Sequence, residues 1–142
     1  MTGSPTITYE PMPQPDDVAT VRAGLSAYNR QHAPDDAFQS LTLFVRDAHG
    51  TVVGGLLGGT IWHWLYVDIL WLSDELRGQG YGSRLLAEAE RLAIERGCIG
   101  SHLDTMSFQA RAFYERHGYT VYGVLDNIPP GYRKYLLQKP LA

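Results

Sequence analysis

A strand pattern, a glycine-rich loop and an amphipathic helix pattern follow one another between Trp64 and Gly97, and this succession most constrains the fold. Trp64–Ser73 is apolar at nearly every position, which is typical of a central strand covered on both faces. The helix pattern that follows, GSRLLAEAERLAIERG, carries a stripe of leucine and alanine and ends at Gly97. A buried strand that enters a helix through a short loop indicates an α/β domain.

The rest of the chain also alternates strand and helix patterns. A first strand is expected at Thr6–Glu10, and a helix is expected to begin at Asp16 or Asp17. The apolar face of that helix consists of Val18, Val21, Leu25 and Tyr28. Further strands are expected at residues 41–47, 51–60, 99–106, 119–127 and 132–139, and a short helix at residues 107–118. These elements predict one α/β (α+β) domain over residues 1–142, with a mixed sheet of about seven strands flanked by helices.

Composition and charge narrow the classes of partner. The formal net charge of −3 argues against nucleic acid as the main partner, because nucleic-acid-binding domains usually carry a basic face. No apolar stretch approaches the length of a membrane span and the N-terminus has no signal-peptide pattern, so no membrane association and a cytoplasmic location are expected. The single cysteine, Cys98, is interpreted as a buried apolar residue. The five histidines show no metal-ligand spacing, so no metal is expected.

The loop glycines Gly78, Gly80 and Gly82 indicate a phosphate-binding loop. The N-terminus of a helix presents unpaired N–H groups and a positive dipole end, and glycines let those amides approach an anion closely. A Walker loop is excluded, because no Lys-Ser/Thr pair follows the required glycine spacing. A dinucleotide fingerprint is excluded as well, because Ser83 occupies the place of its last glycine.

With its preceding arginine the loop has the form Arg77-x-x-Gly80-x-Gly82, which resembles the R/Q-x-x-G-x-G/A pyrophosphate loop of the GNAT superfamily of acetyl-CoA-dependent N-acetyltransferases. A second family signature matches at Ala110, Phe113, Tyr114, Gly118 and Tyr119, with Ser107 in place of the usual asparagine. The resemblance implies a mostly antiparallel sheet and acetyl-CoA as co-substrate. The implied cofactor-binding residues are Leu70, Leu72, Arg77, Gly78, Gln79, Gly80, Tyr81, Gly82, Ser83, Ser107, Ala110 and Phe113.

The resemblance also implies catalytic roles for two residues. Tyr114 matches the family tyrosine whose hydroxyl lies near the CoA sulfur, so it is expected to protonate the leaving thiolate; the alternative is a core aromatic residue. Asp68 is expected to act as the base that deprotonates the acceptor amine. It interrupts an apolar strand, is expected on the same face as Leu70 and Leu72, and has a structural carboxylate as its alternative interpretation.

The acceptor site is less constrained by the sequence. Tyr28, Trp62, His63 and Trp64 are candidates for walls that hold a cationic amine, with ordinary packing as the alternative. The predicted function is acetyl transfer to the primary amine of a small molecule. The alternatives are a protein acetyltransferase, acting on N-termini or lysines, and a non-catalytic CoA-binding sensor module. A homodimer is also predicted, with the segment IPPGYRKYLL, residues 128–137, as a candidate edge strand.

Overall fold

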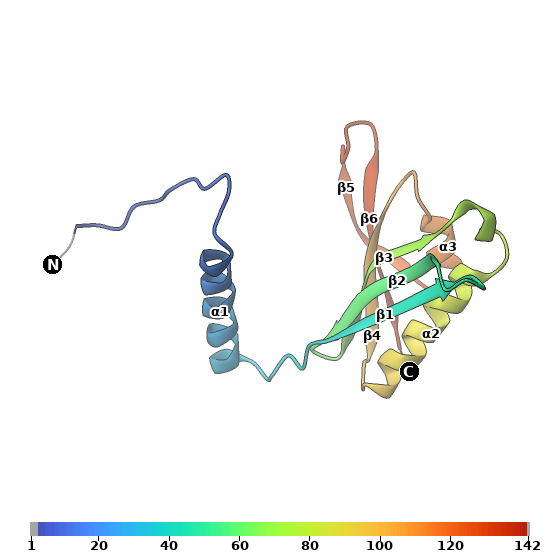
Figure 1. The fold of residues 1–142 in the computed structure, drawn as a ribbon, viewed down its shortest axis with the longest axis horizontal. Helices are drawn as coiled ribbons and strands as arrows, with labels where there is room; N and C mark the ends of the chain where they lie inside the picture. Colours follow the sequence, from blue (N-terminus) through green and yellow to red (C-terminus); the bar gives the residue numbers. More distant parts are fainter. Residues whose placement is uncertain (1–2, 142) are drawn as a thin grey trace. The chain divides into compact units, whose positions relative to one another are not determined.

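The computed structural model describes residues 3–141, and its chain separates into two compact units that meet at the boundary between Asp35 and Asp36. Figure 1 shows the elements of both units along the chain. The first unit holds one helix, and the second holds the whole sheet with the remaining helices. No helix among residues 3–141 is both long and apolar enough to cross a membrane.

The first unit consists of an extended segment followed by helix α1, Pro15–His32. Proline at the first helical turn and two aspartates beside the positive dipole end favour the start of α1. The expected strand at Thr6–Glu10 is not formed, since this segment pairs with no other strand of the described chain. The structure therefore has six described strands rather than about seven.

The second unit is built on one mixed, mostly antiparallel sheet of the order β1-β2-β3-β4-β6-β5. Among the described strands, only β3 and β4 run parallel. The strands are β1 Gln39–Arg46, β2 Val52–Ile61, β3 Trp64–Leu72, β4 Gly100–Met106, β5 Thr120–Asp126 and β6 Arg133–Pro140.

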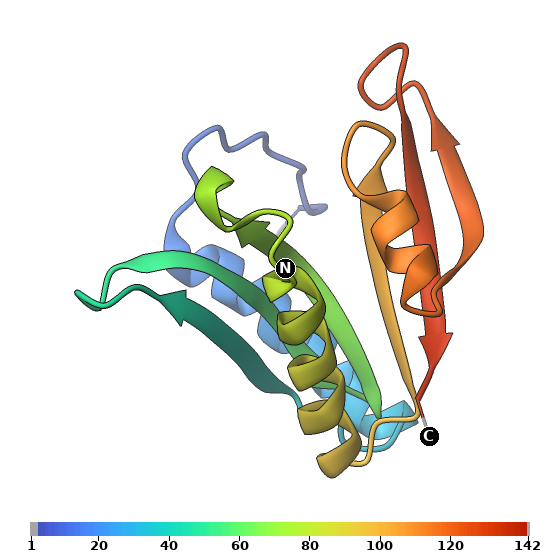
Figure 2. The same ribbon diagram turned by 90° about the vertical axis from the view of Figure 1, so that its right-hand side faces the viewer.

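Helix α2, Tyr81–Glu95, connects β3 to β4 and covers one face of the sheet (Figure 2). Its leucine and alanine stripe packs on the inward side chains of the strands, as the sequence pattern predicts. The buried apolar core comprises Leu41, Leu56, Leu65, Val67, Leu103 and Leu137 from the sheet and Leu85, Leu86, Ala89 and Ala93 from α2. A short helix, α3 Arg111–Arg116, follows β4.

One expectation about the strands is wrong. The segment 128–137 is no edge strand, because β6 lies between β4 and β5 and pairs with both. Within the second unit, the inward side chains of β3 are buried under α2, and Ile69 and Trp71 lie on its opposite face.

Candidate active-site cleft

Strands β3 and β4 separate halfway along their length, and a cleft of about 550 Å³ opens where they part. Their parallel pairing extends only from Trp64 and Gly100 to Val67 and Leu103. Beyond that point β3 continues for five residues along one wall of the cleft. The cleft is lined by residues 67–72, Arg77, Gly82, Asp104, Thr105, Phe108, Gln109, Ala110, Phe113 and Tyr114.

A β-bulge in β3 sets this separation. Leu57 of β2 pairs with Ile69 and Gly58 pairs with Val67, so Asp68 is an extra residue without a partner. A bulge bends its strand and increases its twist, which turns the end of β3 away from β4. The edge of residues 69–72 that faces the cleft therefore has no strand partner among the described residues. It presents backbone N–H and C=O groups that an extended ligand can pair with.

The glycine loop lies at the end of the cleft where α2 begins. Gly78 and Gly80 adopt φ angles of +76° and +87°, which L side chains rarely adopt, and a Cβ added at either position would meet open space. Gly80 is the N-cap of α2, and no side chain caps the helix. The first turn also lacks acidic residues. Its orphan amides and the positive dipole end are thus available to an anion.

Side chains around the loop hold its position. Gln79 donates from Nε2 to the Glu75 carbonyl at 2.6 Å. Arg77 is part of the cleft lining, and its guanidinium lies 3.6 Å from the carboxylate of Asp74, with both side chains exposed. An exposed pair of this kind is weak, so Arg77 can turn to a phosphate at small cost.

Gly82, at the end of the loop, packs closely against the wall of the cleft. A Cβ at this position would contact the Phe113 ring at 3.4 Å and Leu72 Cδ1 at 3.7 Å. The neighbouring Ser83 hydroxyl lies 2.9 Å from Nε2 of His117 at the end of α3. The beginning of α2, the end of β3 and helix α3 therefore pack directly against each other at the cleft.

Tyr114 is placed in the cleft lining by α3, with its side chain 7% exposed. Its ring packs edge-on against Phe113, with centroids 5.1 Å apart, and against Tyr119 at 5.9 Å. Burial raises the pKa of the Tyr114 hydroxyl above its ordinary value of 10.0. The hydroxyl therefore keeps its proton throughout the neutral range and can donate it.

Asp68 lies in the cleft lining, but not as the sequence suggested. It is exposed rather than buried, and the bulge places it on the face of Tyr66, opposite to Leu70 and Leu72. Leu70 and Leu72 pack against the core and also line the cleft. The physical reason is the extra residue at Asp68, which reverses the alternation of faces for the rest of β3.

A polar and aromatic group beside Asp68 was missed by sequence reasoning. Tyr66 and His102 are paired across β3 and β4, with ring centroids 5.0 Å apart, and Asp104 follows on the same face of β4. Burial raises the pKa of Tyr66, and the carboxylates of Asp104 and Asp68 raise it further. Burial lowers the pKa of His102. Only the strand register brings these four residues together, since no motif in the sequence links them.

Ser107 and Ala110 lie close together after β4, with different surroundings. The Ser107 hydroxyl accepts a hydrogen bond from the Arg133 backbone N–H at 3.0 Å, so it ties the end of β4 to the start of β6. Ala110 lines the cleft, and its backbone N–H donates to the Thr105 hydroxyl at 3.4 Å.

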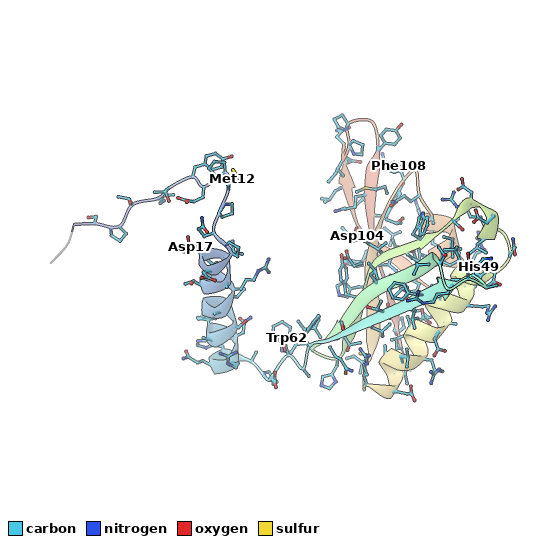
Figure 3. The ribbon with its side chains drawn as sticks, viewed as in Figure 1. Met12, Asp17, His49, Trp62, Asp104 and Phe108 are labelled. Atoms are coloured by element: carbon cyan, nitrogen blue, oxygen red, sulfur yellow. The ribbon has the colours of Figure 1, made fainter. Side chains whose placement is uncertain are left out.

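Three of the acceptor candidates lie at the other end of β3 from the cleft. Trp62 and His63 form the tight turn that precedes β3, and Trp64 is its first residue, whereas the cleft starts at Val67. Figure 3 shows Trp62 at the opposite end of the sheet from Phe108. His63 instead anchors the end of α2, because its Nδ1 lies 3.1 Å from the Gly97 carbonyl. Tyr28, on α1, belongs to the other unit.

Comparisons with known proteins give one consistent family. The model of the GNAT acetyltransferase family matches residues 9–119. A blasticidin-S acetyltransferase of Streptomyces morookaense is 48% identical over 93 residues, which cover 65% of this chain and 68% of the relative. An acetyltransferase of Agrobacterium fabrum strain C58 is 39% identical over 119 residues, covering 84% of this chain and 87% of the relative.

The fold agrees with this assignment. A crystal structure from Agrobacterium tumefaciens, of a protein assigned as an acetyltransferase, superposes with a TM-score of 0.90 at 34% identity, covering 95% of this chain and 98% of that one. The cleft is lined by Arg77 and Gly82 of the loop motif and by Ala110, Phe113 and Tyr114 of the helix motif. This chain belongs to the GNAT acetyltransferase family.

Proposed function

We propose that this protein transfers the acetyl group of acetyl-CoA to the primary amine of a small molecule by direct transfer. The single observation that carries the proposal is the cleft between β3 and β4, which joins an unpaired strand edge, an anion-binding loop and the Tyr114 hydroxyl. These three features suit the three parts of acetyl-CoA: an extended pantetheine arm, a pyrophosphate and a thioester. The residues present fit this co-substrate.

The pyrophosphate is assigned to the first turn of α2. The amides of Gly80, Tyr81, Gly82 and Ser83 are the orphan donors there, and Arg77 adds a charge-assisted contact. The pantetheine amides are assigned to the free edge of β3 near Leu70 and Leu72, where backbone groups pair as in a sheet. Ser107 is a weaker candidate for a CoA contact, because its hydroxyl already accepts from Arg133.

The reaction is an acyl transfer in which the amine attacks the thioester carbonyl carbon. The new C–N bond forms, the C–S bond breaks, and the sulfur leaves as a thiolate that takes the proton of the Tyr114 hydroxyl. A β3 backbone N–H at the free edge stabilises the oxyanion that develops on the carbonyl. The amine loses its proton to Asp68, directly or through water, and solvent reprotonates the tyrosine.

The acceptor is assigned to the face of the sheet that carries Asp68, Asp104 and Tyr66. Two carboxylates beside the cleft attract an ammonium group, and they lie where an amine must reach the thioester. The similarity to a blasticidin-S acetyltransferase supports a small-molecule acceptor over a protein. The Asp104 carboxylate also forms a weak ion pair with Lys134, whose Nζ lies 4.0 Å away.

Thiol release from acetyl-CoA tests the proposal directly. The purified chain is supplied with acetyl-CoA and a panel that includes blasticidin S, simple di- and polyamines, and peptides with free N-termini or lysines. We expect release that depends on a small-molecule amine, with the acetylated product confirmed by mass spectrometry. Turnover with peptides alone would replace this proposal with a protein acetyltransferase. Tight acetyl-CoA binding with no turnover on any acceptor would favour the sensor module.

A further inference from the structure

Two aromatic rings from distant parts of the sequence meet beside the cleft. Phe108, in the turn between β4 and α3, is part of the cleft lining. Its ring meets the ring of Tyr132 edge-on, with centroids 5.3 Å apart and ring planes at 85°. Tyr132 belongs to the turn that connects β5 to β6. This aromatic pair, Phe108 and Tyr132, therefore joins the tip of the β5–β6 hairpin to the cleft.

The turn that carries Phe108 is fixed by hydrogen bonds on both sides of that residue. The Ser107 N–H donates to the Arg133 carbonyl at 2.7 Å, and the Arg133 N–H donates back to the Ser107 hydroxyl at 3.0 Å. The Gln109 N–H donates to the Met106 carbonyl at 2.9 Å, and Gln109 Oε1 accepts from the Met106 N–H at 2.7 Å. Because the residues before and after Phe108 are both anchored, its ring is held in position at the cleft.

The tip of the hairpin that carries Tyr132 is fixed in a similar way. The Asn127 N–H donates to the Tyr132 carbonyl at 2.8 Å, and the Tyr132 N–H donates to the Pro129 carbonyl at 2.9 Å. Next to this turn, Arg133 Nε lies 2.9 Å from Asp126 Oδ1. The backbone of Tyr132 is therefore bonded at both its N–H and its carbonyl, and its ring is a fixed support within the aromatic pair.

The aromatic pair lies on the face of the sheet to which the acceptor is assigned above. Lys134 of β6 pairs with Met106 of β4, and Met106 shares the face of Asp104 because the two are two residues apart. Tyr132 precedes Lys134 by two residues, which places it on the same face. In Figure 3, Phe108 lies beyond Asp104 toward the tip of the β5–β6 hairpin. An amine held at Asp104 therefore has the aromatic pair beside it.

We propose that Phe108, supported by Tyr132, determines acceptor specificity and selects primary amines that carry a planar aromatic or heteroaromatic ring on a short arm. This inference rests on the acetyl transfer proposed above and names its class of acceptor. The ammonium group is attracted by the carboxylates of Asp68 and Asp104, while the planar ring packs on the Phe108 ring. Pairs of aromatic rings are favoured beyond the area that they bury, whereas a saturated ring of the same size gains from burial alone. Phe108 contacts the acceptor, and Tyr132 is a positioning residue that acts through Phe108.

Two amines of nearly the same size test the role of Phe108. 2-Phenylethylamine and 2-cyclohexylethylamine have the same arm and the same number of carbon atoms, but only the first has a planar ring. We expect the parent enzyme to acetylate the planar amine with a kcat/KM about 3- to 10-fold higher, and Phe108→Leu to lower this ratio to about 1. Comparison of the ratio between enzymes cancels the intrinsic reactivity of each amine. A parent ratio near unity, or a ratio that Phe108→Leu leaves unchanged, overturns the proposal.

Variants of Tyr132 test its positioning role. Tyr132→Phe keeps the ring and should keep the parent ratio, because the edge-on contact needs no hydroxyl. Tyr132→Leu should lower the ratio toward that of Phe108→Leu, and a parent ratio in this variant overturns the positioning role. Phe44→Leu removes an aromatic ring of β1 that does not line the cleft, and it is the matched control that should keep the ratio. An equal loss for both amines in Phe108→Leu, with a raised KM for acetyl-CoA, places the ring against CoA and overturns the acceptor role.

A binding measurement separates failure of this inference from failure of the proposed reaction. Absence of turnover with every amine would contradict the acetyl transfer, and ligand-observed NMR of the same two amines with the CoA-loaded protein then tests the ring contact alone. Weaker binding of 2-phenylethylamine to Phe108→Leu than to the parent, with unchanged binding of 2-cyclohexylethylamine, supports the contact. Equal binding of both amines to parent and variant overturns it.

Discussion

The Tyr114 hydroxyl can be removed without disturbing its ring, which contacts Phe113 and Tyr119. We expect Tyr114→Phe to lower kcat by about 100-fold, at the lower end of general-acid contributions, because a thiolate leaves readily even without a proton. The Michaelis constant for acetyl-CoA should change much less, since the hydroxyl acts mainly in the transition state. Steady-state kinetics with a good acceptor measure both.

The pH profile of the parent enzyme tests the same residue. Burial raises the pKa of Tyr114 above 10.0, so the acid form persists through neutral and mildly basic pH. Loss of activity through ionisation of this group is therefore expected only above pH 10, and this basic limb should disappear in Tyr114→Phe. Full turnover by Tyr114→Phe at every pH would identify the tyrosine as a packing residue.

Asp68 is exposed at a bulge, so its removal should leave the fold intact. We expect Asp68→Asn to lower kcat/KM by about 10- to 100-fold where the acceptor amine is mostly protonated, and less at high pH, where the free amine needs no base. The measurement is kcat/KM from pH 6 to pH 10 beside a thermal melt. A uniform loss at all pH values would indicate that Asp68 positions the acceptor instead.

At the scale of elements, the loop between β3 and α2 depends on the left-handed backbone of Gly80. Gly80→Ala costs about 1 to 2 kcal/mol of strain although space surrounds the new Cβ. If the loop relaxes, its amides lose their alignment, and we expect acetyl-CoA affinity to fall about 10-fold, a change of about 1.4 kcal/mol. Isothermal titration calorimetry measures this affinity.

Gly50→Ala is the matched control for the loop variant. Gly50 has a φ of +82° and is also surrounded by open space, but it lies in the turn between β1 and β2, outside the cleft. The Gly50→Ala variant should lower the melting temperature about as much as Gly80→Ala does, while leaving acetyl-CoA affinity unchanged. Equal losses of affinity in the two variants would mean that the loop acts only through stability.

At the scale of the whole second unit, a buried polar network joins α2 to β4 and β6. The Tyr119 hydroxyl donates to Glu90 Oε2 at 2.8 Å and lies 2.7 Å from the Ser101 hydroxyl, and Lys139 Nζ donates to Glu90 Oε1 at 2.7 Å. Burial is the main cause that raises the pKa of Tyr119. A carboxylate in this position is tolerated because each of its oxygens has a partner.

Removal of the Tyr119 hydroxyl, which contacts both Glu90 and Ser101, should therefore destabilise the fold. We expect Tyr119→Phe to lower the free energy of unfolding by about 1 to 3 kcal/mol, because Glu90 and Ser101 each lose a buried partner. Tyr122→Phe, at an exposed position of β5, should change it by less than about 0.5 kcal/mol. Urea unfolding of both variants gives the comparison. Equal urea midpoints for Tyr119→Phe and Tyr122→Phe would show that the network adds no net stability.

Local patterns were enough to predict much of this molecule. The stripe of α2 and the strand–loop–helix succession follow from short-range spacing. Arg77, Gly82 and Tyr114 follow from the resemblance of two short motifs to those of the GNAT family, and the structure places these three residues in one cleft. A helix stripe depends on residues three and four apart, and a loop amide depends on its own backbone. Such features are therefore encoded within a few residues of sequence.

The features that the sequence did not predict depend on pairing between strands that are distant in the chain. The bulge that exposes Asp68, the position of β6 between β4 and β5, and the grouping of Tyr66, His102 and Asp104 all depend on register. The same register puts Trp62 and His63 at the far end of β3 from the cleft. One inserted residue reverses the face of every later side chain in a strand, and this choice is made by the contacts of the whole sheet rather than by the strand's own sequence.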